Sequence, residues 1–127
     1  MSKNEFIQPD GVARPDFPYS PVVVSGDLVY TAGQVANDAS GAVVSDDVEA
    51  QTRQALDNVR ACLAAAGCGL EDVIKVNAFL TDLANFELYN AVYREYFSEP
   101  FPARTTVGAA LAPGLHVEIE VVARRPA

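Results

Sequence analysis

The sequence predicts an α+β fold, in which two helices pack on one face of a mixed β-sheet of five or six strands. Two observations support this prediction. Several short runs alternate apolar and polar residues, and two longer segments repeat apolar residues at three- and four-residue steps. Two helices can cover only one face of such a sheet. The 127 residues contain no internal repeat and no linker, so we predict a single domain over residues 1–127.

The first strands are expected after residues 1–18, which several prolines and a glycine keep from forming regular structure. The run SPVVVSGDLVYTAGQV then places two strand-forming segments around Ser25-Gly26-Asp27. This composition is typical of a tight hairpin. A second turn is predicted at residues 38–42, and the pattern after it leaves a further strand open.

The first helix is predicted from about Asp47 to Ala66, where apolar residues form one stripe along the helix. Ser45 or Asp46 can cap its start, because the side-chain oxygen of such residues accepts from a free backbone N–H. Gly67 is placed to end the helix in a left-handed conformation.

The segment Val73 to Leu80 alternates and is predicted as a strand. The residues expected on its apolar face are Ile74, Val76, Ala78 and Leu80. A second helix is predicted from Leu83 or Asn85 to Phe97. Its aromatic residues recur at helical spacing and are interpreted as core packing; they are Phe86, Tyr89, Tyr93, Tyr96 and Phe97.

Two alternating runs, Ala103 to Leu111 and Leu115 to Arg124, end the sequence and are interpreted as a terminal hairpin. Their apolar residues are expected under the helices, which leaves the polar ones on the opposite face. The residues predicted on that opposite face are Arg104, Thr106, Gly108, Ala110, His116, Glu118, Glu120, Val122 and Arg124. A face of this mixed composition indicates that subunit packing covers it, so we expect a homo-oligomer.

Arg104 and Glu118 are the strongest candidates for chemistry. The guanidinium of an arginine fits a carboxylate with two hydrogen bonds, and a glutamate can hold and deprotonate a water molecule. A structural salt bridge is the alternative, and the pattern alone is more typical of it. Hairpin register places Arg104 opposite Val122 and Glu118 opposite Gly108, so a joint site would combine residues from two subunits.

Composition excludes several functions. The net charge of −8 opposes binding of a polyanion, because nucleic-acid affinity depends on phosphate neutralisation. No apolar run approaches the ~20 residues that cross a bilayer, and no secretory signal is evident. We therefore expect a cytoplasmic protein that binds neither nucleic acid nor membrane. Cys62, Cys68 and His116 lack the ligand number of a zinc site, and no metal is expected.

Motifs along nearly the whole chain resemble the Rid (reactive intermediate deaminase, YjgF-like) family. They follow one another in order and spacing: PYS at 18–20, TAGQV at 31–35, Q.R.ALDNV...L.AAG at 51–67, DVIKVNAFLTDLANF at 72–86, YNAVYREYF at 89–97, FPART at 101–105 and VEIE at 117–120. Each motif alone is short and weak. Their combined order and spacing make the resemblance specific.

The resemblance implies a chorismate-mutase-like protomer and a homotrimer with ligand pockets between subunits. It implies an enzyme that needs no cofactor and hydrolyses enamine or imine acids, such as 2-aminoacrylate or 2-aminocrotonate, to 2-keto acids and ammonia. Arg104 would bind the substrate carboxylate, and Glu118 would position the attacking water. The residues implied to bind substrate are Tyr19, Ala32, Gly33, Asn90 and Thr106.

Two departures from the family pattern affect the expected substrate. Ala32 stands where a serine is usual, and Thr106 where a cysteine is usual. A deaminase specialised for another enamine acid, such as 3-aminoacrylate or 2-aminomuconate, is therefore one alternative. A non-catalytic ligand-binding or chaperone-like trimer is another, and a ribonuclease is disfavoured by the acidic charge. Glu120 is an alternative to Glu118 as the residue that holds the water, and His116 is a weaker candidate for proton transfer.

Overall fold

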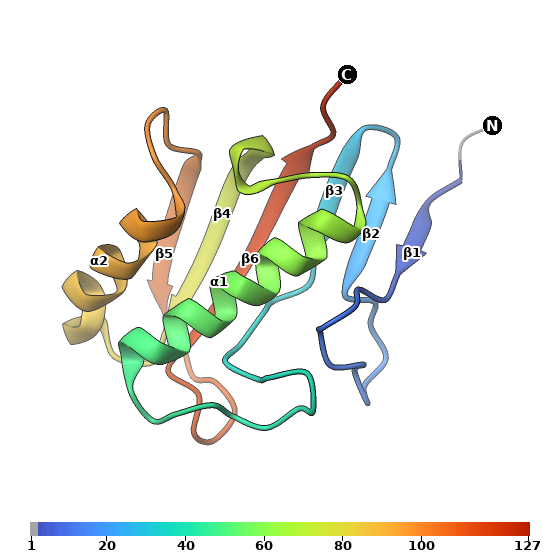
Figure 1. The fold of residues 1–127 in the computed structure, drawn as a ribbon. Coiled ribbons are helices and arrows are strands. Elements are labelled where there is room, and N and C mark those ends of the chain that lie inside the picture. Colours follow the sequence, from blue (N-terminus) through green and yellow to red (C-terminus); the bar gives the residue numbers. More distant parts are fainter. Residues whose placement is uncertain (1–2) are drawn as a thin grey trace.

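The structure, a computed structural model, describes residues 3–127 and consists of one six-stranded mixed sheet with two helices on one face (Figure 1). The strand order is β1-β2-β3-β6-β4-β5. The predicted fold class is confirmed. No helix in the described part of the chain is long and apolar enough to cross a membrane. The elements are β1 (Glu5–Ile7), β2 (Val22–Ser25), β3 (Leu28–Thr31), α1 (Val48–Ala65), β4 (Val73–Leu80), α2 (Phe86–Tyr96), β5 (Ala103–Gly108) and β6 (Val117–Arg124).

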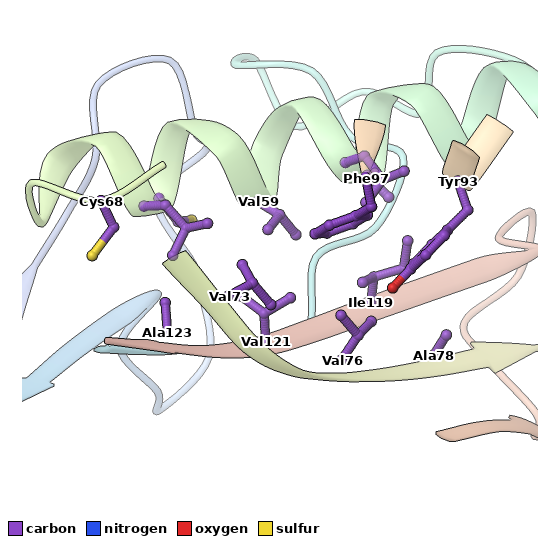
Figure 2. Packing of buried hydrophobic residues seen from close by; sticks show 14 of the residues in the cluster. Val59, Cys68, Val73, Val76, Ala78, Tyr93, Phe97, Ile119, Val121 and Ala123 are labelled. Carbon is purple, nitrogen blue, oxygen red and sulfur yellow. The ribbon is translucent and has the colours of Figure 1, made fainter. Parts of the chain in front are cut away.

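The core lies between the two helices and the covered face of the sheet (Figure 2). Val59 of α1 and Phe97, which follows α2, pack above strands β4 and β6. Figure 2 shows Val76 and Val121 facing them from the sheet. All four side chains are buried, and burial of each contributes roughly 1.5–3 kcal/mol of transfer free energy.

The first half of the sheet follows the prediction with one exception. Strands β2 and β3 form the expected hairpin, and Gly26 at its turn has a φ of 63° that favours glycine. The expectation that residues 1–18 are irregular is wrong for Glu5–Ile7, which pairs with β2 as an edge strand; residues 1–2 lie outside the described residues. The strand left open after residues 38–42 is reduced to one isolated bridge between Asn37 and Val43.

Helix α1 begins one residue beyond the predicted caps. Asp47 is the N-cap, and its Oδ2 accepts from the backbone N–H of Ala50 at 2.8 Å. The prediction of Ser45 or Asp46 as the cap is therefore wrong, although the Ser45 hydroxyl accepts from the Asp47 N–H at 3.0 Å. Gly67 has the predicted left-handed conformation, with a φ of 79°.

The predicted terminal hairpin is wrong. Strand β5 pairs in parallel with β4 at the edge of the sheet, and β6 lies between β3 and β4. Helix α2 connects β4 to β5, and a strand–helix–strand unit of this kind places its two strands side by side and parallel. Strand β6 is then free to run antiparallel to both β3 and β4.

This topology places Arg104 and Glu118 on opposite faces of the sheet. Arg104 pairs with Val76 and therefore points to the helix side, whereas Glu118 pairs with Phe79 on the open side. The prediction that Arg104, Thr106 and Gly108 share the polar face with Glu118 is wrong. Ile74 also departs from prediction, because a bulge between Val73 and Lys75 leaves it 46% exposed.

Candidate active site

The guanidinium of Arg104 lies among aromatic rings of helix α2. Its Nη1 donates to Oδ1 of Asn90 at 2.8 Å. The centre of the guanidinium is 4.8 Å from the ring centroid of Tyr93, 5.4 Å from that of Tyr89 and 5.7 Å from that of Phe86. Rings at these distances attract the cation. We call these five residues the arginine group.

The arginine group is assembled by helical spacing on α2. Positions 86, 89, 90 and 93 recur at three- and four-residue steps, so they share the helix face that looks onto β5. The sequence interpretation of the stripe as core packing is correct for Tyr89 and Tyr93, which are buried. It missed that the same rings surround Arg104. The strand–helix–strand order of β4, α2 and β5 is the signal that places this stripe over Arg104.

Three buried hydroxyls beside Arg104, those of Tyr89, Tyr93 and Thr106, make no hydrogen bond of good geometry among the described residues, although the Tyr89 hydroxyl lies close to Arg104 and Thr106. Burial raises the pKa of Tyr93, and the nearby charge of Arg104 opposes that rise. A buried hydroxyl without a partner costs roughly 1–3 kcal/mol. The arginine group therefore combines one positive charge, N–H and O–H groups that mostly have no hydrogen-bond partner within residues 3–127, and aromatic rings that form a largely apolar wall.

A cavity of about 210 Å³ opens beside the arginine group. It is lined by Asn90, Tyr93, Arg94, Phe101, Pro102 and Arg104. Asn90, which the family resemblance implies to bind substrate, lines this cavity next to Arg104. The Arg104 guanidinium has five N–H donors, and the Nη1 bond to Asn90 is its one side-chain hydrogen bond within residues 3–127. Its remaining N–H groups can donate to a carboxylate.

Glu118 forms a second group on the open face of the sheet. Its carboxylate packs so closely on Gly33 that a β-carbon at that position would overlap its Oε2 atom. Burial of the half-buried side chain raises the pKa of Glu118, and the nearby charge of Glu120 raises it further. Tyr19 and Gly33 line a small cavity of about 50 Å³, and Gly33 connects this cavity to Glu118. We call Tyr19, Ala32, Gly33 and Glu118 the glutamate group.

Glu118 and Glu120, the two candidates for holding the water molecule, differ in their hydrogen bonds. The Glu120 carboxylate accepts a hydrogen bond from Nδ2 of Asn77 at 3.2 Å, whereas Glu118 has no side-chain hydrogen-bond partner among residues 3–127. Glu118 is therefore better placed to hold a water molecule. Ala32, adjacent to Gly33, donates its backbone N–H to the carbonyl of Pro21 at 2.8 Å and is not free to bind a ligand through it.

The structure brings the predicted site residues together in two sets rather than one. Asn90 and Thr106 lie with Arg104 on the helix side. Gly33 packs against Glu118, Ala32 precedes Gly33 in the chain, and Tyr19 shares a small cavity with Gly33. Within one chain the sheet separates the two groups. One chain alone therefore offers Arg104 and Glu118 no common pocket.

His116 and the two cysteines belong to neither group. Nε2 of His116 lies 2.8 Å from Asp46, and the His116 backbone N–H donates to Gln51, which also bonds the loop at Gly114. Cys62 and Cys68 are buried free thiols, and burial raises the pKa of both. Within residues 3–127, no group of three or more His, Cys, Asp or Glu side chains could hold a metal ion.

Comparison with known proteins places the whole chain among known relatives. Residues 12–125 match the family model described as endoribonuclease L-PSP. A RutC family protein of Pyrococcus horikoshii is 41% identical over 121 residues, covering 94% of this chain and 96% of that one. A protein of Salmonella typhimurium named 2-iminobutanoate/2-iminopropanoate deaminase is 41% identical over 112 residues, covering 85% and 88%. The crystal structure of RidA from an Antarctic Psychrobacter is 38% identical, with a TM-score of 0.89 over 94% of this chain and 98% of that one.

Proposed function

The chain belongs to the endoribonuclease L-PSP family, also called the YjgF/Rid family, and from this membership we propose that it hydrolyses reactive enamine and imine acids to 2-keto acids and ammonia. Relatives about 40% identical are named imine deaminases, which supports a Rid-type deamination. The observation that carries the proposal is the Arg104 guanidinium. It is held by Asn90 and three rings, with donors left for a carboxylate.

In this proposal the pocket is formed between two copies of the chain. Arg104 and Glu118 lie on opposite faces of one sheet, so they can meet the same small substrate only if Glu118 comes from another copy. The open face supports this arrangement, because Tyr30 and Val107 are 45% and 42% exposed there beside polar residues. We propose the homotrimer that the family resemblance implies.

The proposed reaction begins when the substrate carboxylate binds Arg104 with two parallel hydrogen bonds. The enamine takes a proton on its terminal carbon and becomes the iminium ion. Water held by Glu118 then attacks the iminium carbon and gives one proton to Glu118, which passes it to the amino nitrogen of the resulting amino alcohol. Ammonia leaves, and the hydroxyl group releases its proton as it becomes the keto group. Positioning and proton transfer supply the catalysis, and no cofactor is required.

The raised pKa of Glu118 suits this role. A carboxyl group whose pKa is nearer neutrality can both accept the proton of water and return it to the leaving nitrogen. Glu120 contributes by its charge, which favours the protonated form of Glu118. Gly33 contributes by its missing side chain, because a β-carbon there would displace the Glu118 carboxylate.

Short enamine acids such as 2-aminoacrylate and 2-aminocrotonate are the proposed substrates. Ala32 and Thr106 bear on the preference among them. Ala32 offers no hydroxyl, and the Thr106 hydroxyl is buried beside Tyr89. We also propose that the protein acts in the cytoplasm.

The test couples a threonine or serine dehydratase, which releases the short-lived enamine, to this protein. Keto-acid formation is then followed against the spontaneous rate. We expect a clear acceleration by the native protein. No acceleration would contradict the deaminase proposal and would leave a non-catalytic ligand-binding trimer as the function of the same pocket.

A further inference from the structure

The cavity beside the arginine group carries a second guanidinium. Arg94 lines the same cavity as Arg104 and belongs to the exposed part of helix α2. It follows Tyr93 directly, so it reaches the cavity from the neighbouring helical position. Of these two arginines, the proposed reaction uses only Arg104.

The charge of this cavity is opposite to that of the chain. The sequence has 17 acidic and 9 basic side chains, yet the lining residues include two arginines and no acidic residue. None of the ion pairs among residues 3–127 involves Arg94. The adjacent Glu95 is engaged instead by Arg53, at 2.9 Å. The cavity therefore has a local positive potential that selects small anions.

The other walls limit the size of such an anion. Tyr93, Phe101 and Pro102 supply apolar surface, and the Tyr93 hydroxyl is buried without a hydrogen-bond partner among the described residues. The volume of about 210 Å³ is below the roughly 300–1,000 Å³ of cavities that hold drug-sized ligands. A compact ligand with an acidic group at each end fits this combination of two cations and a short apolar wall.

We infer that the enzyme prefers enamine and imine acids that carry a second carboxylate, with one carboxylate on Arg104 and the other on Arg94. This inference rests on the proposed deaminase function, because it assigns the substrate class of the same site. Among the enamine and imine acids that the enzyme hydrolyses, those derived from acidic amino acids are bound more tightly than the short alkyl substrates proposed above. Arg94 acts as a specificity-determining residue and takes no part in the bond-making steps.

Binding of the stable keto-acid products tests the inference without requiring turnover. The full-length protein is titrated with 2-oxoglutarate, a dicarboxylate, and with 2-oxobutanoate, a monocarboxylate, by calorimetry. We expect the native protein to bind the dicarboxylate more tightly. Arg94→Gln should reduce that preference about fivefold, because an exposed ion pair contributes up to about this factor. The preference should also fall as salt is raised, since Arg94 is exposed.

Arg60→Gln is the matched control, because it removes one positive charge from an arginine of α1 outside this cavity. It should leave the ratio of the two dissociation constants unchanged. Equal binding of both keto acids by the native protein, or an unchanged ratio in Arg94→Gln, would overturn the inference. The dehydratase-coupled assay with 2-aminoacrylate separates the two proposals. Turnover without a dicarboxylate preference contradicts only the role of Arg94, and a preference without turnover contradicts only the deaminase function.

Discussion

The arginine group and the glutamate group differ in how the fold holds them. Arg104 stands on the edge strand β5 and is fixed by helix α2, through one hydrogen bond to Asn90 and three aromatic rings. Glu118 stands on the interior strand β6 and rests on Gly33, with no side-chain hydrogen bond among residues 3–127. The first group is built for rigid binding, and the second leaves a carboxylate with a raised pKa on a sheet face that a neighbour can cover.

This difference separates substrate binding from proton transfer. Packing of rings on the guanidinium orients its donors before the ligand arrives, which reduces the entropy lost on binding. The carboxylate of Glu118 depends instead on partial burial and on the charge of Glu120. Changes in the first group should therefore act mainly on substrate affinity and rate, and changes in the second on the pH dependence.

The largest effect is expected for Arg104→Ala. Loss of a charge-assisted contact with two hydrogen bonds should cost on the order of 3 kcal/mol, about a hundredfold in kcat/KM. Steady-state kinetics in the dehydratase-coupled assay measure it. Arg104→Lys keeps the charge but loses the planar fork, and should recover only a small part of the rate. Full activity of Arg104→Ala would show that Arg104 does not bind the substrate carboxylate.

Gly33→Ala should reduce kcat roughly tenfold while leaving the fold intact. The new β-carbon would overlap the end of the Glu118 side chain, which can rotate away and thereby loses its position. Gly108→Ala is the control, because a β-carbon there meets Leu83 at an ordinary contact distance of 3.5 Å. Thermal unfolding should show similar stability for both variants. A Gly33→Ala enzyme with native kcat would contradict the proposed role of Glu118.

Glu120→Gln should shift the acidic limb of the activity profile to lower pH. Removing the Glu120 charge lowers the pKa of Glu118, but only in part, because burial is the larger cause of the rise. Glu118→Gln should abolish the acidic limb, because the group that titrates there is removed. The profile of kcat/KM against pH measures both effects, and an unmoved limb in Glu120→Gln would show that another group titrates.

The same raised pKa has a consequence for stability. A carboxyl group whose pKa is higher in the folded state than in the unfolded state stabilises the fold fully below its unfolded pKa, and this contribution is lost as pH rises through the folded pKa. Glu118→Gln should therefore raise the unfolding temperature at neutral pH but not at the acidic end. Calorimetric scans of both proteins from acidic to neutral pH measure this difference in unfolding temperature. An equal rise in unfolding temperature at all pH values would show that Glu118→Gln stabilises the fold through packing and not through the lost charge.

The smallest effect is expected for Tyr93→Phe. Its hydroxyl is buried without a hydrogen-bond partner in the described residues, so removing it should stabilise the protein by about 1 kcal/mol. Urea unfolding measures the gain. Because the ring and its contact with Arg104 remain, the arginine group should stay intact. A loss of stability would mean that the hydroxyl has a partner in the assembled protein.

Local sequence patterns predicted the elements well. The bounds of β4 agree with the predicted strand at Val73–Leu80, and Gly67 ends α1 as predicted. These features depend on neighbouring residues, so the local pattern contains them. Strand β1 was missed because three residues ahead of Pro9 carry too little pattern. Its pairing with β2 stabilises it instead.

The face of Arg104 was predicted wrongly for a physical reason. Alternation shows which residues of a strand share a face, but not which face meets the core. The apolar residues of β5 suggested that Val107 is buried, yet it is 42% exposed on the open face, and the rings of α2 cover the charged Arg104. An arginine can lie on the core side because its stem packs with apolar groups and its cation stacks on rings.

The proposed pocket requires that Arg104 and Glu118 meet across two copies of the chain. Hybrid oligomers test it directly. Arg104→Ala and Glu118→Gln proteins, each with strongly reduced activity alone, are mixed under conditions that exchange subunits, and exchange is verified by native mass spectrometry. Random mixing should restore roughly a quarter of the sites, each with an intact Arg104 from one copy and an intact Glu118 from another. If verified hybrids stay as inactive as their parents, the pocket is not shared between copies.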